Sequence, residues 1–180
     1  MTERAMLDRP RQQSSWSVRP SDSGIDRFAS GTAANVLWLV ARCLIGGLFV
    51  QGGGVKLMAL DAFAASPAKN GVPMADIAAA IGAAVEFGGG LAIVVGLQTR
   101  YAAPLMVAFT IIATLISHRF WEFADAARRQ QSVQFGKNVA IIGGFLLLFV
   151  HGGGRLSLDG WWQRRGPASR SPDEAQRNPE

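Results

Sequence analysis

The chain has few of the residues that build disulfides, metal centres or nucleotide sites. Its single cysteine, Cys43, excludes an internal disulfide, and one cysteine with two histidines leaves no zinc or iron–sulfur ligand set. His118 and His151 fall at the ends of different predicted helices, roughly 20–30 Å apart, so they cannot share a metal ion. No GxSxG, GxGxxG or GK[ST] pattern occurs. The sequence therefore predicts no nucleophile-and-base set, no phosphate-binding loop and no metal site.

Charged residues are also scarce, at 17% of the chain, and they nearly vanish from four long apolar stretches. The stretches cover about 35–58, 76–97, 101–120 and 133–150. Each can form a helix that crosses a bilayer core, which takes about 20 apolar residues. None shows the polar face that a helix of a soluble bundle requires. The sequence therefore predicts an all-α fold, an integral membrane antiparallel four-helix bundle with disordered polar termini.

Polar segments flank this predicted domain of residues 34–160. Residues 1–33 contain five arginines and no apolar run, and residues 161–180 become polar after a Trp pair, so both are predicted to be disordered tails. The net charge of +5 is attributed to basic residues flanking membrane spans, not to nucleic-acid binding. Four spans place both termini on one side, and the excess of arginine there favours the cytoplasm.

One seven-residue phrase occurs twice with a single change, as LFVQGGG at 48–54 and LFVHGGG at 148–154. Glycine is favoured just past a helix C-terminus, where a following cation such as Lys56 or Arg155 meets the negative end of the helix dipole. The phrases therefore predict two helix ends built alike, on opposite membrane faces. Descent from an inverted repeat stays open, because the match is short.

Two charged residues lie inside the predicted spans, Arg42 and Glu86. An unpaired charge at the centre of a bilayer costs about 2.5–3.5 kcal/mol on insertion scales, so a partner is expected. On antiparallel helices Arg42 would lie about 10 Å and Glu86 about 16 Å from the same face, an offset that an arginine side chain bridges. We therefore predict an Arg42–Glu86 pair inside the bundle. It is either a structural lock or a site at which Glu86 relays protons.

Ordered blocks of the sequence resemble the DoxX family of small four-span bacterial membrane proteins. They are ARCLIGGLFVQGGGVKL at 41–57, AAVEFGGGLAIVVGLQTRYAA at 83–103, SHRF at 117–120 and FGKNVAIIGGFLLLFVHGGGRLSLD at 135–159. Family members often have proline in the last glycine turn, where this chain has Gly153. The resemblance implies an inner-membrane four-helix bundle associated with membrane redox chemistry, such as quinone-reducing thiosulfate oxidation or oxidative-stress complexes.

The topology predicts a polar cluster on the membrane face opposite the termini. Lys56 ends the first span, His118 ends the third, and Lys137 and Asn138 begin the fourth. With Glu86 they would form a pocket for a quinone head group or a small anion, or they would simply contact lipid headgroups. The predicted binding residues are Arg42, Lys56, Glu86, His118, Lys137 and Asn138, and the candidate for catalysis is Glu86.

Three functions fit this pattern. The favoured one is an accessory or quinone-interacting subunit of a membrane redox or oxidative-stress system, with a bound quinone as its expected cofactor. Its partners would be the lipid bilayer, soluble or membrane redox proteins and a second copy of the chain, and not nucleic acid. The second is a non-catalytic scaffold or assembly factor that recruits soluble partners. A small-solute transporter ranks last, because four short spans leave little room for alternating access.

Overall fold

The computed structural model describes residues 31–165, and within that range the chain forms helices and no strand. In chain order they are α2 (Thr32–Met58), α3 (Leu60–Lys69), α4 (Ala75–Val95), α5 (Thr99–Ser117), the 3-10 helix η1 (Phe120–Glu122), α6 (Asp125–His151) and α7 (Leu158–Arg165). Helices α2, α4, α5 and α6 are long and apolar enough to cross a membrane. The predicted all-α membrane bundle is confirmed.

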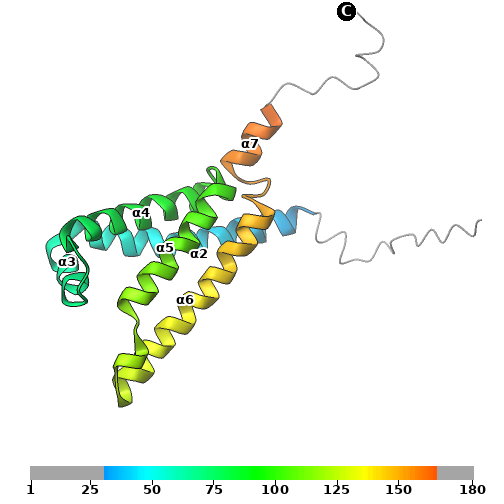
Figure 1. Ribbon diagram of the computed structural model, residues 1–180. Coiled ribbons are helices and arrows are strands. Elements are labelled where there is room, and N and C mark those ends of the chain that lie inside the picture. Colours follow the sequence, from blue (N-terminus) through cyan, green and yellow to red (C-terminus); the bar gives the residue numbers. More distant parts are fainter. Residues whose placement is uncertain (1–30, 166–180) are drawn as a thin grey trace, which may run out of the picture.

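The four long helices pack as two pairs (Figure 1). Helix α2 lies against α4 and α5 lies against α6, while α4 and α5 also touch each other. The pairs meet where α7 projects from the bundle and diverge from there, α2 and α4 toward α3, and α5 and α6 toward the segment that joins them (Figure 1). The end near α7 and the end near α3 are called the α7 end and the α3 end below. The turn between α4 and α5 and the loop between α6 and α7 both belong to the α7 end.

Glycines bring α2 and α4 into close contact. A Cβ atom on Gly46 would lie 2.8 Å from the carbonyl oxygen of Gly90, and one on Gly53 would lie 2.5 Å from the backbone nitrogen of Phe87. Lipid tails are as apolar as leucine, so membrane helices associate through such close packing of small residues. Gly46 and Gly53 therefore form a face of α2 on which its backbone can lie directly against the backbone of α4.

This packing corrects the prediction that both glycine phrases end helices. The first phrase lies inside α2, which continues to Met58, because its glycines are used for contact with α4. The second phrase does end a helix. Helix α6 stops at His151, and Gly152 then adopts a φ of 74°, a conformation that glycine reaches without strain. Like phrases thus serve different purposes in the two helices.

Adjacent glycines of α2 provide a test of the close contact. We expect Gly46→Ala to destabilise the bundle by about 1–3 kcal/mol, because the new Cβ meets the α4 backbone. Gly47→Ala should instead stabilise it by up to about 1 kcal/mol through helix propensity, since no described atom lies within 4 Å of its Cβ position. Equilibrium unfolding in mixed micelles measures both. Equal effects of the two substitutions would contradict the α2–α4 contact.

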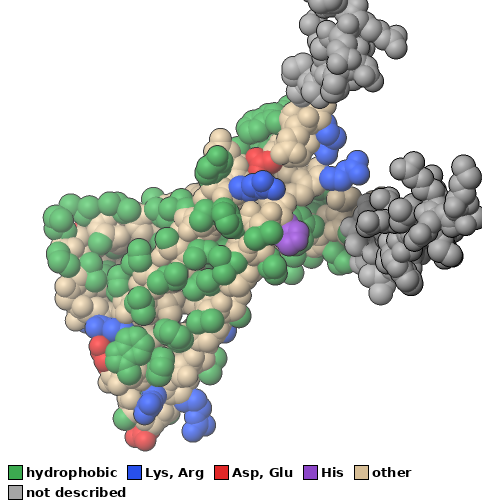
Figure 2. Space-filling view, turned by 45° about the vertical axis from the view of Figure 1, so that its right-hand side comes forward, with side chains coloured by type: hydrophobic (Ala, Val, Ile, Leu, Met, Phe, Trp, Pro, Cys, Tyr) green, Lys and Arg blue, Asp and Glu red, His purple; other side chains and the backbone are tan. Residues whose placement is uncertain are grey.

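The packed core lies where the two helix pairs meet. Phe49, Ile93, Met106 and Phe145 are buried there, and the ring centroids of Phe49 and Phe145 lie 5.2 Å apart. Outside this region the long helices are mostly unburied, since only 11–28% of their most apolar stretches is buried. Figure 2 shows hydrophobic side chains spread over the face of the bundle that is in view. Apolar surface of this extent requires an apolar surrounding, which lipid chains supply.

Three segments differ from the sequence prediction. Helix α3 was not predicted, and α6 begins at Asp125, well before the predicted start at 133. Residues 161–165, predicted to be disordered, instead belong to α7. That helix is held by a hydrogen bond from Trp161 N to Ser157 O (2.9 Å), and the Arg165 guanidinium lies 3.9 Å from the Trp161 ring centroid. The rest of the predicted tails, residues 1–30 and 166–180, lies outside the described residues.

Candidate functional site

Glu86 is buried in the middle of α4 and pairs with Lys56 of α2. Its Oε2 atom lies 2.5 Å from Lys56 Nζ, and the whole residue is 7% exposed. The Cβ position of Gly52, one turn before Lys56, lies 2.6 Å from Glu86 Oε1. Side chains on a helix lean toward its N-terminus, so Lys56 reaches back over Gly52 to the carboxylate. The glycine makes room for the acid, and the lysine of the next turn neutralises it.

Arg42 does not contact Glu86, so the predicted pair between them is wrong. The guanidinium is almost fully buried and donates hydrogen bonds to the carbonyl oxygens of Gly153 and Leu156, the latter at 2.7 Å. A Cβ on Gly96 would lie 2.5 Å from Arg42 Nη1, so the group also packs against the α4–α5 turn. The hydrogen-bond acceptors of this guanidinium are backbone carbonyls of the loop after α6, while its buried Nε atom has no hydrogen-bond partner within the described residues.

The same end of the molecule contains further contacts between distant segments. Both carboxylate oxygens of Asp159 accept backbone N–H groups at the start of α5, from Gln98 at 2.7 Å and Thr99 at 2.8 Å. Trp38 Nε1 donates to the carbonyl oxygen of Gly152 at 3.0 Å. Together with Arg42 these contacts fix the α6–α7 loop onto α2 and the α4–α5 turn. Sequence reasoning missed the capping role of Asp159, since the helix that it caps lies about sixty positions away.

An apolar groove opens between α3, α4 and α5 beside the Lys56–Glu86 pair. It encloses about 440 Å³, and Phe63, Phe109 and Ile112 are among its apolar lining residues. Lys56 also lines it, with Nζ 4.9 Å from the Phe63 ring centroid. The Lys56 side chain is 33% exposed whereas that of Glu86 is 9% exposed, so a ligand would meet the ammonium first. An apolar groove with one charged group at its wall suits an amphiphilic ligand.

The remaining predicted site residues belong to the α5–α6 pair instead. Asn138 Nδ2 donates to Thr114 Oγ1 at 2.8 Å, and His118 Nδ1 lies 2.8 Å from the side-chain oxygen of Gln131. Lys137 is exposed on α6. Within residues 31–165, no hydrogen bond or ion pair joins these residues to Lys56. Lys56 is therefore paired with α4, whereas the other three members of the predicted cluster belong to the α5–α6 pair, where His118 and Asn138 make contacts between those two helices.

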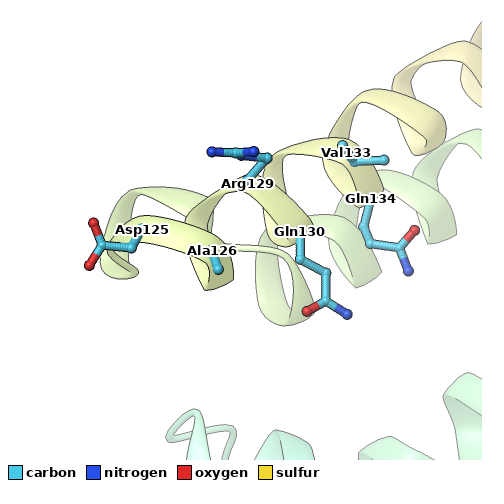
Figure 3. A pocket seen from close by; sticks show the side chains of 6 residues that line it. All are labelled: Asp125, Ala126, Arg129, Gln130, Val133 and Gln134. Atoms are coloured by element: carbon cyan, nitrogen blue, oxygen red, sulfur yellow. The ribbon is translucent and has the colours of Figure 1, made fainter.

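A further hollow of about 630 Å³ lies along the first turns of α6 (Figure 3). Its lining residues are Asp125, Ala126, Arg129, Gln130, Val133 and Gln134. All of them come from one helix, so no second element forms an opposing wall. Within the described residues, moreover, no three His, Cys, Asp or Glu side chains lie close enough to hold a metal ion. The groove beside Lys56 is therefore the stronger candidate for a small-molecule site.

Four long apolar helices, an internal ion pair and a lateral groove define a small four-span membrane protein. The chain belongs to the DoxX family, whose model matches residues 37–119. It is 36% identical over 132 residues to Inner membrane protein YphA of Escherichia coli (strain K12), covering 73% of this chain and 94% of that protein. It is 37% identical over 121 residues to Inner membrane protein YqjF of the same strain, covering 67% and 88%. No solved structure matches the chain.

Proposed function

We propose that the chain is an inner-membrane subunit that binds a quinone-class amphiphile in the groove between α3, α4 and α5. The observation that carries the proposal is Lys56, paired with Glu86, at the wall of a groove whose other lining residues are mostly apolar. Ionisable residues at membrane depth are costly, and they commonly mark ligand or proton pathways. The location follows the two relatives, which are both inner-membrane proteins.

The chemistry of the groove fits such a ligand. A quinone ring carries carbonyl oxygens that accept hydrogen bonds, and its isoprenoid tail is apolar. The Lys56 ammonium has three N–H donors, one of which faces Glu86, so others remain for a head group. Phe109, Ile112 and the other apolar lining residues would contact the tail. A bound quinone would supply two-electron, two-proton chemistry, and a partner redox protein would exchange the electrons. In this role the chain is not a stand-alone enzyme.

The orientation belongs to the same proposal. Seven basic residues lie near the spans on the α7 side, against six on the other side. The first set is Arg19, Arg27, Arg100, Arg155, Arg164, Arg165 and Arg170, and the second is Lys56, Lys69, Arg119, Arg128, Arg129 and Lys137. Arginines more distant in the tails add to the first set. Basic residues close to spans favour the cytoplasmic side. Both termini would then be cytoplasmic, and the groove would open toward the α3 end, on the outer half of the membrane.

Binding of decylubiquinone, a short-chain quinone, to the purified full-length protein in detergent tests the site. The double variant Lys56→Gln/Glu86→Gln removes both charges and leaves no unpaired buried charge. We expect it to bind about tenfold more weakly, the effect of one lost hydrogen bond from a charged donor. The matched control is Arg119→Gln/Glu122→Gln, which removes a 3.0 Å ion pair between partly exposed side chains that do not line the groove. The control should bind like the unmodified protein in microscale thermophoresis.

A second variant tests the groove independently of charge. Ala108 lines the groove, so Ala108→Phe should obstruct it, whereas Ala41→Phe adds the same bulk to the exposed face of α2. Only the first should weaken decylubiquinone binding. If the charge variant and Ala108→Phe both fold, by circular dichroism, and both bind the quinone as the unmodified protein does, the proposed function is wrong.

A further inference from the structure

A second pocket, of about 600 Å³, lies at the α7 end between the start of α5, the end of α6 and α7. Its lining includes two arginines, Arg100 and Arg155, with His151 and the aromatic rings of Tyr101 and Trp162. Figure 2 shows Lys and Arg side chains gathered where the bundle meets α7. This pocket is separate from the groove beside Lys56, which lies between α3, α4 and α5.

Positive charge exceeds negative charge in this pocket, because Arg100 and Arg155 line it against one carboxylate, Asp159. Both carboxylate oxygens of Asp159 accept backbone N–H groups at the start of α5, so this side chain is held at the helix start and forms no ion pair with either arginine. The ion pairs found within residues 31–165 are Lys56–Glu86 and Arg119–Glu122, so neither Arg100 nor Arg155 belongs to one. A third guanidinium is adjacent, because Arg164 donates to the carbonyl oxygen of Arg155 at 2.8 Å. The pocket is therefore suited to an anion.

His151 adds a further polar group. Its Nδ1 atom lies 3.0 Å from the carbonyl oxygen of Leu147, and a carbonyl oxygen only accepts, so Nδ1 carries a hydrogen in this contact. The ring lies against Trp38, with centroids 5.3 Å apart, and within the described residues Nε2 makes no hydrogen bond. Among the described residues, moreover, the backbone N–H groups of Gly154 and Arg155 have no acceptor. Successive free N–H groups in a glycine turn are typical of anion-binding loops.

The depth of the pocket indicates which anion it meets. Helix α4 ends at Val95, α5 begins at Thr99 and α6 ends at His151, so the pocket lies where three spans leave the hydrocarbon core. Tyr101 is 77% exposed and Trp162 is 50% exposed, and such rings collect at headgroup level. We propose that this pocket binds the phosphate group of an anionic phospholipid, with Arg100 and Arg155 as its direct contacts. Basic pockets between membrane helices recognise lipid headgroups in this way.

Native mass spectrometry of the full-length protein in detergent, titrated with phosphatidylglycerol, tests the proposal. The variant Arg100→Gln/Arg155→Gln removes two charges from exposed side chains and should retain the fold. We expect its apparent affinity for phosphatidylglycerol to fall about tenfold or more. The matched control is Arg128→Gln/Arg129→Gln, which removes two exposed charges at the opposite end of α6. That variant should stay within about twofold of the unmodified protein, because charges remote from the ligand contribute little.

Two further titrations identify the source of the anion. Phosphatidylcholine, with a zwitterionic headgroup, should bind more weakly than phosphatidylglycerol, and millimolar inorganic phosphate should not displace phosphatidylglycerol. Equal binding of both lipids, or equal losses in both double variants, would overturn the proposal. Displacement by inorganic phosphate that depends on Arg100 and Arg155 would assign the pocket to a soluble anion and overturn the lipid assignment. None of these results depends on quinone binding at Lys56, so the two proposals can fail separately.

Discussion

Arg42→Met is expected to destabilise the protein by about 3–6 kcal/mol, because two hydrogen bonds from a charged donor are lost. The guanidinium is 1% exposed and donates to the carbonyl oxygens of Gly153 and Leu156. A methionine fills similar space but leaves both carbonyls without their donor. The α6–α7 loop would then lose its contact with α2. Equilibrium unfolding of the purified protein in mixed micelles measures the change.

The control for this experiment is Arg100→Met at the same end of the molecule. Arg100 is exposed and belongs to no ion pair within the described residues, so its loss should change the free energy of unfolding by less than about 0.5 kcal/mol. Arg42→Lys should recover less than half of the loss, since one ammonium cannot reproduce the planar fork that reaches two carbonyls. Full recovery with lysine, or a stable Arg42→Met variant, would contradict the structure.

The helices could be predicted from sequence because one property decides them. A run of about 20 apolar residues has a single stable form in a bilayer, a helix whose backbone groups bond to each other. Helix α3 escaped this reasoning because it is short and carries polar residues such as Asp61 and Lys69. The first turns of α6 escaped it for the same reason, since Arg128, Arg129 and their neighbours are polar. Hydropathy therefore finds the part of each helix inside lipid and misses the part outside it.

The partner of Arg42 could not be read from the sequence. Charge pairing considers side chains, whereas the acceptors here are main-chain carbonyls, which every residue has. The sequence blocks quoted above nevertheless contain the segments that meet. The blocks that resemble the DoxX family include Arg42, the α4–α5 junction at Gly96 and Thr99, and Asp159 at the start of α7. In the structure these three segments meet at the α7 end.

The partner of Glu86 was missed for a different reason. Because glycines often end helices, Lys56 was assigned to the membrane surface beyond the first glycine phrase. The helix instead continues through Gly52–Gly54, so Lys56 keeps helical register with Gly52 and faces the same side. The signal available in the sequence is that Gly52 lies one helical turn before Lys56, which puts both residues on one face of the first helix.

A double-mutant cycle on Lys56 and Glu86 is the second experiment with a large expected effect. Lys56→Met leaves the buried carboxylate without its cation, and we expect a cost of about 3 kcal/mol. This is the lower end for a buried pair, because the lysine side chain is one-third exposed and solvent weakens the attraction. Adding Glu86→Gln should restore much of the stability, since an amide of the same shape carries no charge to bury. The coupling energy between the two positions should be about 2 kcal/mol.

The cycle between Arg42 and Glu86 should behave in the opposite way. The two residues have separate partners, Arg42 in the α6–α7 loop and Glu86 in Lys56, so Arg42→Met and Glu86→Gln should be additive within about 0.5 kcal/mol. If the arginine were the true partner of the carboxylate, the coupling would move from the lysine cycle to the arginine cycle. Coupling in only the Lys56 cycle would mean that Arg42 stabilises the α6–α7 loop independently of Glu86. Lys56, paired with Glu86, would then be free to act at the groove that it lines. The folding role and the ligand-binding role of the two buried charges can then be altered independently.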